Sequence, residues 1–517
     1  MHTGIVCPAT AGPRRARRIL LLAAVASAAV VGAPLAVARS GATTATPIQS
    51  IGFVGHGDGP GFGMGQWGAF GDAVRYHKTE AQILNHFYGG TVASSLVGSL
   101  LGANPTISVV ILENVSPVGT VGYDPVVTSP SAFTVTGAGW TPPTTTTSTT
   151  STTSTTASTT STTTSTTSTT TTSPPATTNP RISLRPSIVA PPSSTTTTTL
   201  PPGVITVQAG MAVDLRLTGA GTWDVYESTS CTSARATAGR SVPIATGLID
   251  PSVHPASASP NAPPASLLTL CRHDGVDEVV RGDVEAYDRS GYERTLNVLP
   301  LQSYLDGVVP AEESPSWGSA GATPGAPQGH PWGFQALEVQ AVASRSYAVA
   351  YMEAGGWEGY ASICDTVCEA YVGENFESPL TDAAVTYTSG AVRVERSSGQ
   401  VALTSYSASS GGWTARSAFP AVRDLGDACV VAGNPLECNP NHTWHLTVSA
   451  SAVRRRFRGL GRLVGITVVA RNRRGTLGGR VEDIVVSGVR SSKTVTGWEF
   501  AAALGLPSDW FAVKSVA

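Results

Sequence analysis

A long Thr/Ser-rich segment is the feature that most limits how this 517-residue chain can fold. From about residue 141 to 200 the chain is mostly Thr and Ser with scattered Pro, and such a composition cannot bury enough apolar surface to offset the entropy lost on ordering. The segment at 141–203 is therefore predicted to be a disordered linker. Because alternating strand patterns occur on both of its sides, at 132–135 and 204–208, we interpret it as an insertion in one β-rich region.

The first 38 residues have the organisation of a secretory signal peptide. A basic cluster at 14–18 precedes an apolar run from Ile19 to Val31, and Ala36-Val37-Ala38 offers small residues for cleavage. The apolar run has about 13 residues, fewer than the roughly 20 of a membrane-spanning helix, and no later run reaches that length. We expect a secreted or wall-associated, extracytoplasmic protein with no span after cleavage. Uncleaved, the same segment would be an N-terminal anchor.

Charge and cysteine content narrow the function classes further. The charged fraction is 13% and the net charge is -2, which argues against nucleic acid as a partner. Without Cys7 of the leader, six cysteines remain, an even set that favours disulfides in an oxidising compartment. Pairing sequence neighbours gives 231–271, 364–368 and 429–438. The alternative is that Cys364 and Cys368 form half of a metal site, completed in space by His442 and His445.

Hydrophobic periodicity predicts an α+β fold. A helix pattern covers Ala69 to Phe87, followed by β-rich runs up to residue 140, and a second β-rich region covers 204–296. The unit at 297–517 contains a long Ala-rich helix from about Phe334 to Met352, short strands, and a closing helix near Glu499 to Leu504. Strands and helices neither alternate strictly nor are all of one kind, so we expect a mixed β-rich domain around a buried Ala-rich helix.

A glycine-dense run at 55–69 is predicted to be part of a site. Seven of these fifteen residues are glycine, and such a run persists where the backbone turns sharply or lies close to another group. His56, Gln66 and Trp67 are the side chains there that could hydrogen-bond to a sugar or stack on it. The alternative is a surface loop of a separate small domain, formed by the region 47–140.

Glu312 is the strongest candidate for an acid–base residue. It follows the apolar stretch 307–311, and a carboxyl that is desolvated there would keep its proton near neutral pH, as a general acid must. The alternative is that Glu312 and Glu313 simply begin a helix.

Polar groups on two later segments are further candidates. The Ala-rich helix carries Gln340, Arg345 and Tyr347, although an arginine in such a helix often only pairs with an acceptor. The turn from Tyr406 to Gly412 either lines a sugar groove with hydroxyl groups or is a polar loop. It lacks the Gly-x-Ser-x-Gly elbow of serine hydrolases.

Taken in order, these segments resemble the SpoIID/LytB family of stage II sporulation protein D lytic transglycosylases and amidase enhancers. The resemblance covers about 220 residues of the C-terminal part and about 45 near the N-terminus, and it is carried by Leu301-x2-Tyr304-Leu305-x-Gly307-Val308-Val309-x-Ala311-Glu312, Ala336-Leu337-x2-Gln340-Ala341-Val342-Ala343-x-Arg345-x-Tyr347-Ala348, Cys368-x2-Tyr371-x-Gly373, Tyr406-x-Ala408-Ser409-Ser410-Gly411-Gly412, Trp510-Phe511 and the Gly-His-Gly…Gln-Trp-Gly-Ala segment. In the sporulation proteins the glycine segment lies near the C-terminal end, whereas here it precedes the linker. Glu313-Ser314-Pro315 stands where the family commonly has Met-Pro.

The resemblance implies a protein that binds peptidoglycan glycan strands and cleaves the MurNAc–GlcNAc β-1,4 bond, leaving 1,6-anhydro-MurNAc ends. Glu312 would act first as acid and then as base, with no metal or cofactor and without a second catalytic carboxylate. The alternative is a non-catalytic wall-binding enhancer of an N-acetylmuramoyl-L-alanine amidase. A stalked surface adhesin is a third, less specific interpretation. The substrate-binding residues implied are Gln340, Arg345, Tyr347, Tyr371, Tyr406, Ser409, Ser410, Gly411, Gly412, His56, Gln66 and Trp67.

Overall fold

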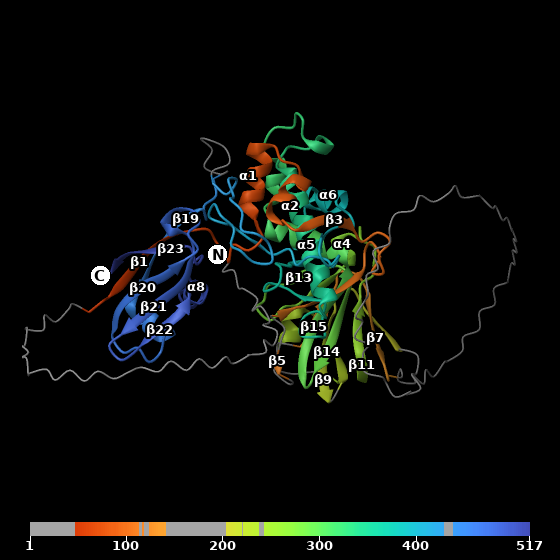
Figure 1. Ribbon diagram of the computed structural model, residues 1–517. Helices are drawn as coiled ribbons and strands as arrows, with labels where there is room; N and C mark the ends of the chain where they lie inside the picture. Colours follow the sequence, from red (N-terminus) through yellow and green to blue (C-terminus); the bar gives the residue numbers. More distant parts are fainter. Residues whose placement is uncertain are drawn as a thin grey trace, which may run out of the picture.

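The computed structural model describes residues 47–112, 116–117, 124–140, 203–219, 221–236, 242–428 and 438–516. The predicted signal peptide, the predicted linker up to residue 202, and Cys429 lie outside these ranges. The described residues form a large β-sheet region, a helical layer above it, and a separate C-terminal lobe (Figure 1). The predicted α+β class is thereby confirmed. No helix among the described residues is long and apolar enough to cross a membrane.

The largest sheet contains strands from both sides of the Thr/Ser-rich segment. β7 (Phe133–Ala138) precedes that segment and β8 (Gly203–Val207) follows it, and the two pair antiparallel with Val135 opposite Ile205. Phe133 and Val135 are buried while the threonines between them are partly exposed, as expected for a strand with one face on the core. The remaining strands of this sheet are β4 (Thr106–Val110), β5 (Ser116–Pro117), β6 (Val126–Thr128), β9 (Ala212–Gly219), β10 (Thr222–Ser228), β11 (Ala245–His254), β12 (Leu268–Leu270), β13 (Glu278–Val280), β14 (Asp283–Arg289), β15 (Tyr292–Pro300) and β16 (Ile363–Cys364).

The helical layer is built around α5 (Phe334–Glu353), the predicted Ala-rich helix. Its residues 334 to 349 are all buried, as in a helix with neighbours on every side. Ala336, Ala341 and Ala343 have no exposed surface, and their small side chains let the surrounding elements approach closely. Those elements are α1 (Gln66–Tyr76), α2 (Glu80–Phe87), α4 (Leu301–Glu312), α6 (Pro379–Tyr387) and the antiparallel pair β3 (Thr91–Ser95) and β17 (Ala391–Glu395).

The prediction of one helix from Ala69 to Phe87 is wrong, because the chain forms α1 and α2 instead. His77 has a left-handed backbone (φ 50°) and ends α1. Thr79 then begins α2 with a capping box, in which its hydroxyl accepts from the amide of Gln82 and the Gln82 side chain accepts from the amide of Thr79. A cap of this kind satisfies backbone groups that a continuous helix would not expose, so it favours a break at this point.

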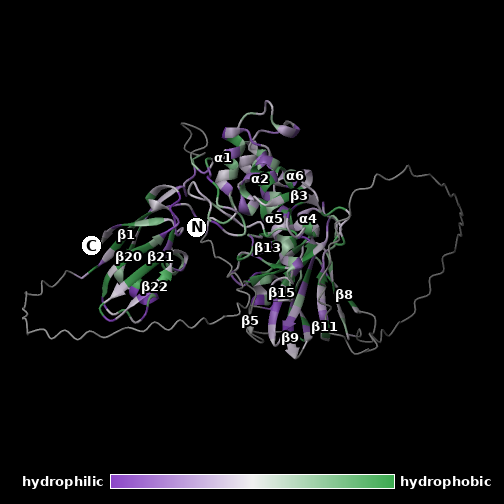
Figure 2. Ribbon diagram, viewed as in Figure 1, coloured by the Kyte–Doolittle hydropathy of each residue, from purple (hydrophilic) through white to green (hydrophobic). Residues whose placement is uncertain are grey.

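The C-terminal lobe includes the first described strand of the chain. β1 (Ser50–His56) lies between β19 (Thr443–Ser449) and β23 (Phe511–Val516), and Phe53 packs edge-on against Phe500 and Phe511. A second sheet contains β20 (Leu463–Arg471), β21 (Val481–Gly488) and β22 (Ser492–Thr496), with α7 (Ala450–Arg456) and α8 (Gly497–Leu504) beside it. Hydrophobic residues are frequent along these strands (Figure 2). The N-terminal strand thus completes the core of this lobe.

Shorter elements connect these parts. β2 (Met64–Gly65) pairs in parallel with β18 (Tyr406–Ser407), and α3 (Cys231–Arg235) packs on the large sheet. The 3₁₀ helices are η2 (Pro264–Ser266), η3 (Pro315–Ser319), η4 (Pro327–Gly329), η5 (Gly373–Phe376) and η7 (Thr476–Gly478).

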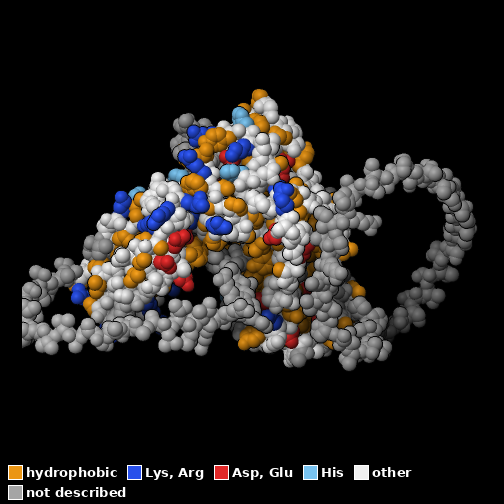
Figure 3. Space-filling view, in the orientation of Figure 1, with side chains coloured by type: hydrophobic (Ala, Val, Ile, Leu, Met, Phe, Trp, Pro, Cys, Tyr) orange, Lys and Arg blue, Asp and Glu red, His pale blue; other side chains and the backbone are white. Residues whose placement is uncertain are grey.

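Charge is distributed unevenly over the chain. Residues 450–517 contain twelve Lys and Arg against four Asp and Glu, a net charge of +8, so the rest of the chain carries -10 to reach the total of -2. Lys and Arg side chains are visible on the surface of the C-terminal lobe (Figure 3). The low overall net charge is therefore an average of a basic lobe and an acidic remainder, and it does not describe the lobe by itself.

Candidate functional site

Glu312 is the last residue of α4, so the alternative that it begins a helix is wrong. Glu313 is extended (φ -130°, ψ 141°), and Pro315 disfavours a helical conformation of Ser314 before it. The carbonyl groups at this end of α4 carry partial negative charge, which disfavours an ionised carboxylate beside them. The helix end thus places Glu312 where its neutral form is supported.

The Glu312 side chain is partly exposed, and each of its oxygens accepts one hydrogen bond. The amide of Ala370 donates to Oε1 at 2.7 Å. The side-chain amide of Gln66 donates to Oε2 at 3.2 Å and also to the Glu312 main-chain carbonyl at 3.1 Å. These contacts fix the carboxyl in one orientation, and each oxygen retains a second lone pair for a proton.

The glycine-dense run is what brings Gln66 to Glu312. Gln66 begins α1, and the preceding residues lie against the turn at 407–412. A Cβ on Gly68 would lie 2.1 Å from Asp424 Oδ2, and one on Gly63 would lie 1.9 Å from the Ser405 carbonyl oxygen. Any side chain at these positions would push the run away from its neighbours. The glycines therefore permit the close approach that the sequence predicted, and the alternative of a separate small domain is wrong.

Glu369 is a second carboxyl at this site, and the sequence reasoning missed it. The side chain is 2% exposed and lies directly before Ala370, whose amide contacts Glu312. Tyr304 donates to Oε2 at 3.0 Å and Tyr406 donates to Oε1 at 2.9 Å. Burial, and then the charge of Glu312, raises the pKa of the Glu369 carboxyl to about 8. The only available signal was its position between Cys368 and Tyr371 in a recognised motif.

Glu313 is a third carboxyl in this region. It is 2% exposed, and within the described chain neither of its oxygens has a hydrogen-bond partner. Burial raises its pKa well above the usual value, and the charge of Glu312 adds to this shift. The sequence suggested burial of Glu312, whereas the structure buries Glu313 and leaves Glu312 accessible.

Three of the expected substrate-binding residues surround this carboxyl group cluster. Gln340 has no exposed surface, accepts from Gln66 at 3.4 Å and donates to the Ser344 hydroxyl at 3.0 Å. Ser344 in turn donates to the Tyr406 hydroxyl at 3.4 Å. Tyr347 is 9% exposed, with its ring 6.3 Å from that of Tyr406. A continuous set of contacts thus connects Glu312 to Glu369 through Gln66, Gln340, Ser344 and Tyr406.

Arg345 and Tyr371 are buried in structural contacts, which corrects their assignment to the substrate. Arg345 is 1% exposed and donates to the carbonyls of Val385 and Ala391, both at 3.1 Å. This is the pairing with acceptors that the sequence left open. Tyr371 is 1% exposed, donates to Asn297 Oδ1 at 2.5 Å and stacks on Tyr304. Neither side chain is accessible to a glycan.

The hydroxyl-rich turn is also held by internal bonds. Ser409 and Ser410 have no exposed surface, and their hydroxyls donate to Asp427 and Asp424 respectively. Gly411 and Gly412 have positive φ values of 75° and 102°, a conformation that favours glycine. The serine hydroxyls therefore orient the turn instead of lining a groove, which corrects their expected role.

His56 and Trp67 lie apart from each other. The ring of His56 contacts the carbonyl of His442 at 3.1 Å and the hydroxyl of Thr476 at 2.9 Å, in the C-terminal lobe. Burial lowers the pKa of His56, and no contact described for it reaches Glu312. Trp67 is partly exposed and packs edge-on against Trp317, with ring centroids 4.9 Å apart. Of the residues named in the glycine segment, Gln66 is the one that reaches the glutamate.

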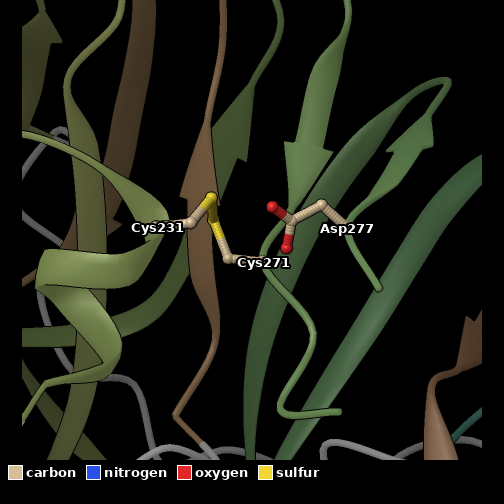
Figure 4. Close-up of side chains that lie close together, drawn as sticks. All are labelled: Cys231, Cys271 and Asp277. Atoms are coloured by element: carbon tan, nitrogen blue, oxygen red, sulfur yellow. A yellow bond between two sulfur atoms is a disulfide. The ribbon is translucent and has the colours of Figure 1, made fainter. Parts of the chain in front are cut away.

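The cysteines form disulfides where they are described. Cys231 pairs with Cys271 and Cys364 pairs with Cys368, which confirms two predicted pairs and excludes the half metal site in this structure. Cys438 is disulfide-bonded, while its expected partner Cys429 lies outside the described residues. Cys231, Cys271 and Asp277 come close enough together to suggest a metal site (Figure 4). The disulfide occupies both sulfurs and Asp277 pairs with Arg235, so this group offers no thiolate ligand.

Comparison with known families locates a match over the centre of this site. Residues 289–394 match the family model SpoIID, stage II sporulation protein. This segment contains α4, Glu312, α5 and Glu369, and the match confirms the resemblance carried by the sequence motifs. It indicates a role related to the bacterial cell wall. No curated protein and no solved structure matches the chain.

Proposed function

We propose that this protein is an exported lytic transglycosylase that acts on peptidoglycan glycan strands and uses Glu312 as its acid and base. The observation that carries the proposal is the state of the Glu312 carboxyl. It is partly exposed at the end of α4, oriented by Gln66 and Ala370, and next to the buried Glu369. An accessible, oriented carboxyl in a negative environment is suited to donate a proton and take it back.

In the proposed reaction Glu312 protonates the glycosidic oxygen while the bond from that oxygen to C1 of MurNAc breaks. The resulting carboxylate accepts the proton of the MurNAc 6-hydroxyl as its oxygen attacks C1. The products are a free GlcNAc 4-hydroxyl and a 1,6-anhydro-MurNAc end, and Glu312 regains its proton. One carboxyl is sufficient because the nucleophile belongs to the substrate, unlike in hydrolases that position two carboxylates around a water.

The experiment is digestion of purified sacculi, with and without stem peptides, followed by mass analysis of the soluble fragments. We expect 1,6-anhydro-MurNAc ends with the native protein. Glu312→Gln should keep the fold and glycan binding and lose these ends, because an amide of nearly the same shape cannot exchange the proton. Glu482→Gln is the matched control, since Glu482 is exposed on β21 far along the chain in the C-terminal lobe.

Two outcomes would contradict the proposal. Anhydro ends at a native rate with Glu312→Gln would show that another group carries the proton. Glycan binding without any anhydro ends, together with faster release of stem peptides by an added N-acetylmuramoyl-L-alanine amidase, would instead indicate an amidase enhancer.

A further inference from the structure

The contacts of Glu369 go beyond what the proposed one-carboxyl reaction requires. Its two oxygens each accept a tyrosine hydroxyl, from Tyr304 on α4 and from Tyr406 on β18. The chain then continues directly to the Ala370 amide, which donates to Glu312 Oε1. A carboxyl that is 2% exposed is costly to place beside another carboxyl, so its presence calls for a physical role.

A second route of contacts joins the same two carboxyls. From Tyr406 it passes through Ser344 and Gln340 to Gln66, which donates to the other oxygen of Glu312. Glu369 therefore acts on both sides of the Glu312 carboxyl, through the backbone on one side and through side chains on the other. A change in the protonation of either carboxyl alters which of these groups can donate and which can accept.

We propose that Glu369 is a positioning residue that shares one exchangeable proton with Glu312 and thereby keeps Glu312 able to act as an acid near neutral pH. The inference rests on the proposed function for its catalytic meaning. Two carboxyls that interact at low dielectric do not both ionise readily, so the pair retains a proton over a pH range in which an isolated glutamate would have lost it.

The groups around Glu369 support this role. The titratable side chains that influence it or its tyrosine partners are Glu312, Glu313, Tyr88, Tyr304, Tyr347 and Tyr406. All are carboxyl or phenol groups, so none supplies a positive charge that would stabilise two carboxylates together. The two tyrosine hydroxyls stabilise the ionised form of Glu369 and so favour placing the shared proton on Glu312.

The first test does not depend on catalysis. Thermal unfolding is measured for the native protein, Glu312→Gln, Glu369→Gln and the double variant, at about pH 5 and about pH 8.5. At the lower pH, Glu369→Gln should change the melting temperature equally whether residue 312 is Glu or Gln. At the higher pH the change should be more favourable with Glu312 present, because only then does the variant relieve repulsion between two carboxylates. Equal changes at both pH values would overturn the proposal.

The second test is the pH dependence of anhydro-end formation. Without the negative charge of Glu369, Glu312 should lose its proton more readily, so the alkaline limb of the rate profile should move to lower pH by about one unit or more, with KM little changed. Tyr406→Phe removes one donor to Glu369 and should move the limb in the same direction, which keeps the test open if Glu369→Gln does not fold. Glu482→Gln is the control.

The outcomes separate the two proposals. A uniform loss of rate with an unmoved alkaline limb would reduce Glu369 to a structural residue. If the native protein forms no anhydro ends while the unfolding cycle shows coupling at high pH only, the proton sharing stands and the transglycosylase assignment fails.

Discussion

The buried carboxyl of Glu313 leads to a quantitative prediction about stability and pH. Glu313 is 2% exposed and neither oxygen has a hydrogen-bond partner within the described residues. Its ionised form would be unpaired in a region of low dielectric, so the folded protein holds it protonated. In the unfolded chain the same group ionises near its ordinary pKa of 4.5.

The sign of the effect follows from proton binding in the two states. Between the unfolded pKa and the raised folded pKa, the folded state binds one more proton than the unfolded state. The contribution to stability is therefore fully present below about pH 4.5 and is lost as the pH rises toward the folded pKa. The loss is about 1.4 kcal/mol for each pH unit within this window.

Glu313→Gln removes this titration and keeps the shape of the side chain. The free energy of unfolding of the variant relative to the native protein should rise by about 3 kcal/mol between about pH 5 and about pH 7, two units of the slope above. The buried amide adds an unsatisfied group at every pH, so the slope is the informative quantity and the offset is not.

The assay is denaturant unfolding at several pH values from about 5 to 7.5, followed by tryptophan fluorescence. Glu482→Gln, on the surface of β21, is the matched control and should give a constant difference from the native protein. A constant difference for Glu313→Gln as well would refute the reasoning, because it would mean that Glu313 ionises in the folded protein as it does in the unfolded chain.

Two further predictions concern the packing of the helical layer and the Thr/Ser-rich segment. Arg345→Met should destabilise the protein by roughly 2–4 kcal/mol, measured by denaturant unfolding against the exposed Arg490→Met, because it leaves carbonyls of α6 and β17 without donors; Arg345→Lys should recover little, since one ammonium cannot span both carbonyls, and an unchanged midpoint would contradict the structural role. Replacing residues 141–200 by a short Gly/Ser connector should leave the melting temperature and activity unchanged, because Trp140 and Gly203 are already in contact. A chain that begins at Val204 should fail to fold stably, since it lacks β1 and Gln66; an unchanged melting temperature would contradict this.

Much of the fold follows from local patterns in the sequence. The Ala-rich helix was predicted at Phe334 to Met352 and is found at Phe334–Glu353, because alanines and straight-chain residues without proline or glycine favour a helix in any context. The two described disulfides join sequence neighbours, which the chain brings together at little entropic cost. The break at His77 escaped prediction because a capping box competes with helix continuation over only a few residues.

The candidate site was less predictable than the fold. Glu312 could be named from its motif, and Gln66 from the glycine run. Neither the burial of Glu313 nor the position of Glu369 has a local signal, since burial depends on which distant elements cover a residue. The hydroxyls of Ser409 and Ser410 were expected to face a sugar for the same reason: the sequence shows that they can donate, and it does not show that Asp427 and Asp424 accept from them.

The sequence by itself determined the elements, the likeness to SpoIID proteins and the residue proposed to carry the proton, because these depend on spacing along the chain. Only the tertiary structure decided that the N-terminal strand completes the C-terminal lobe, that Gln66 reaches Glu312 across 246 residues, and that three carboxyls meet at the end of α4. The physical reason is that electrostatic and hydrogen-bond partners are set by distance in space and by exclusion of water. Both are properties of the packed chain.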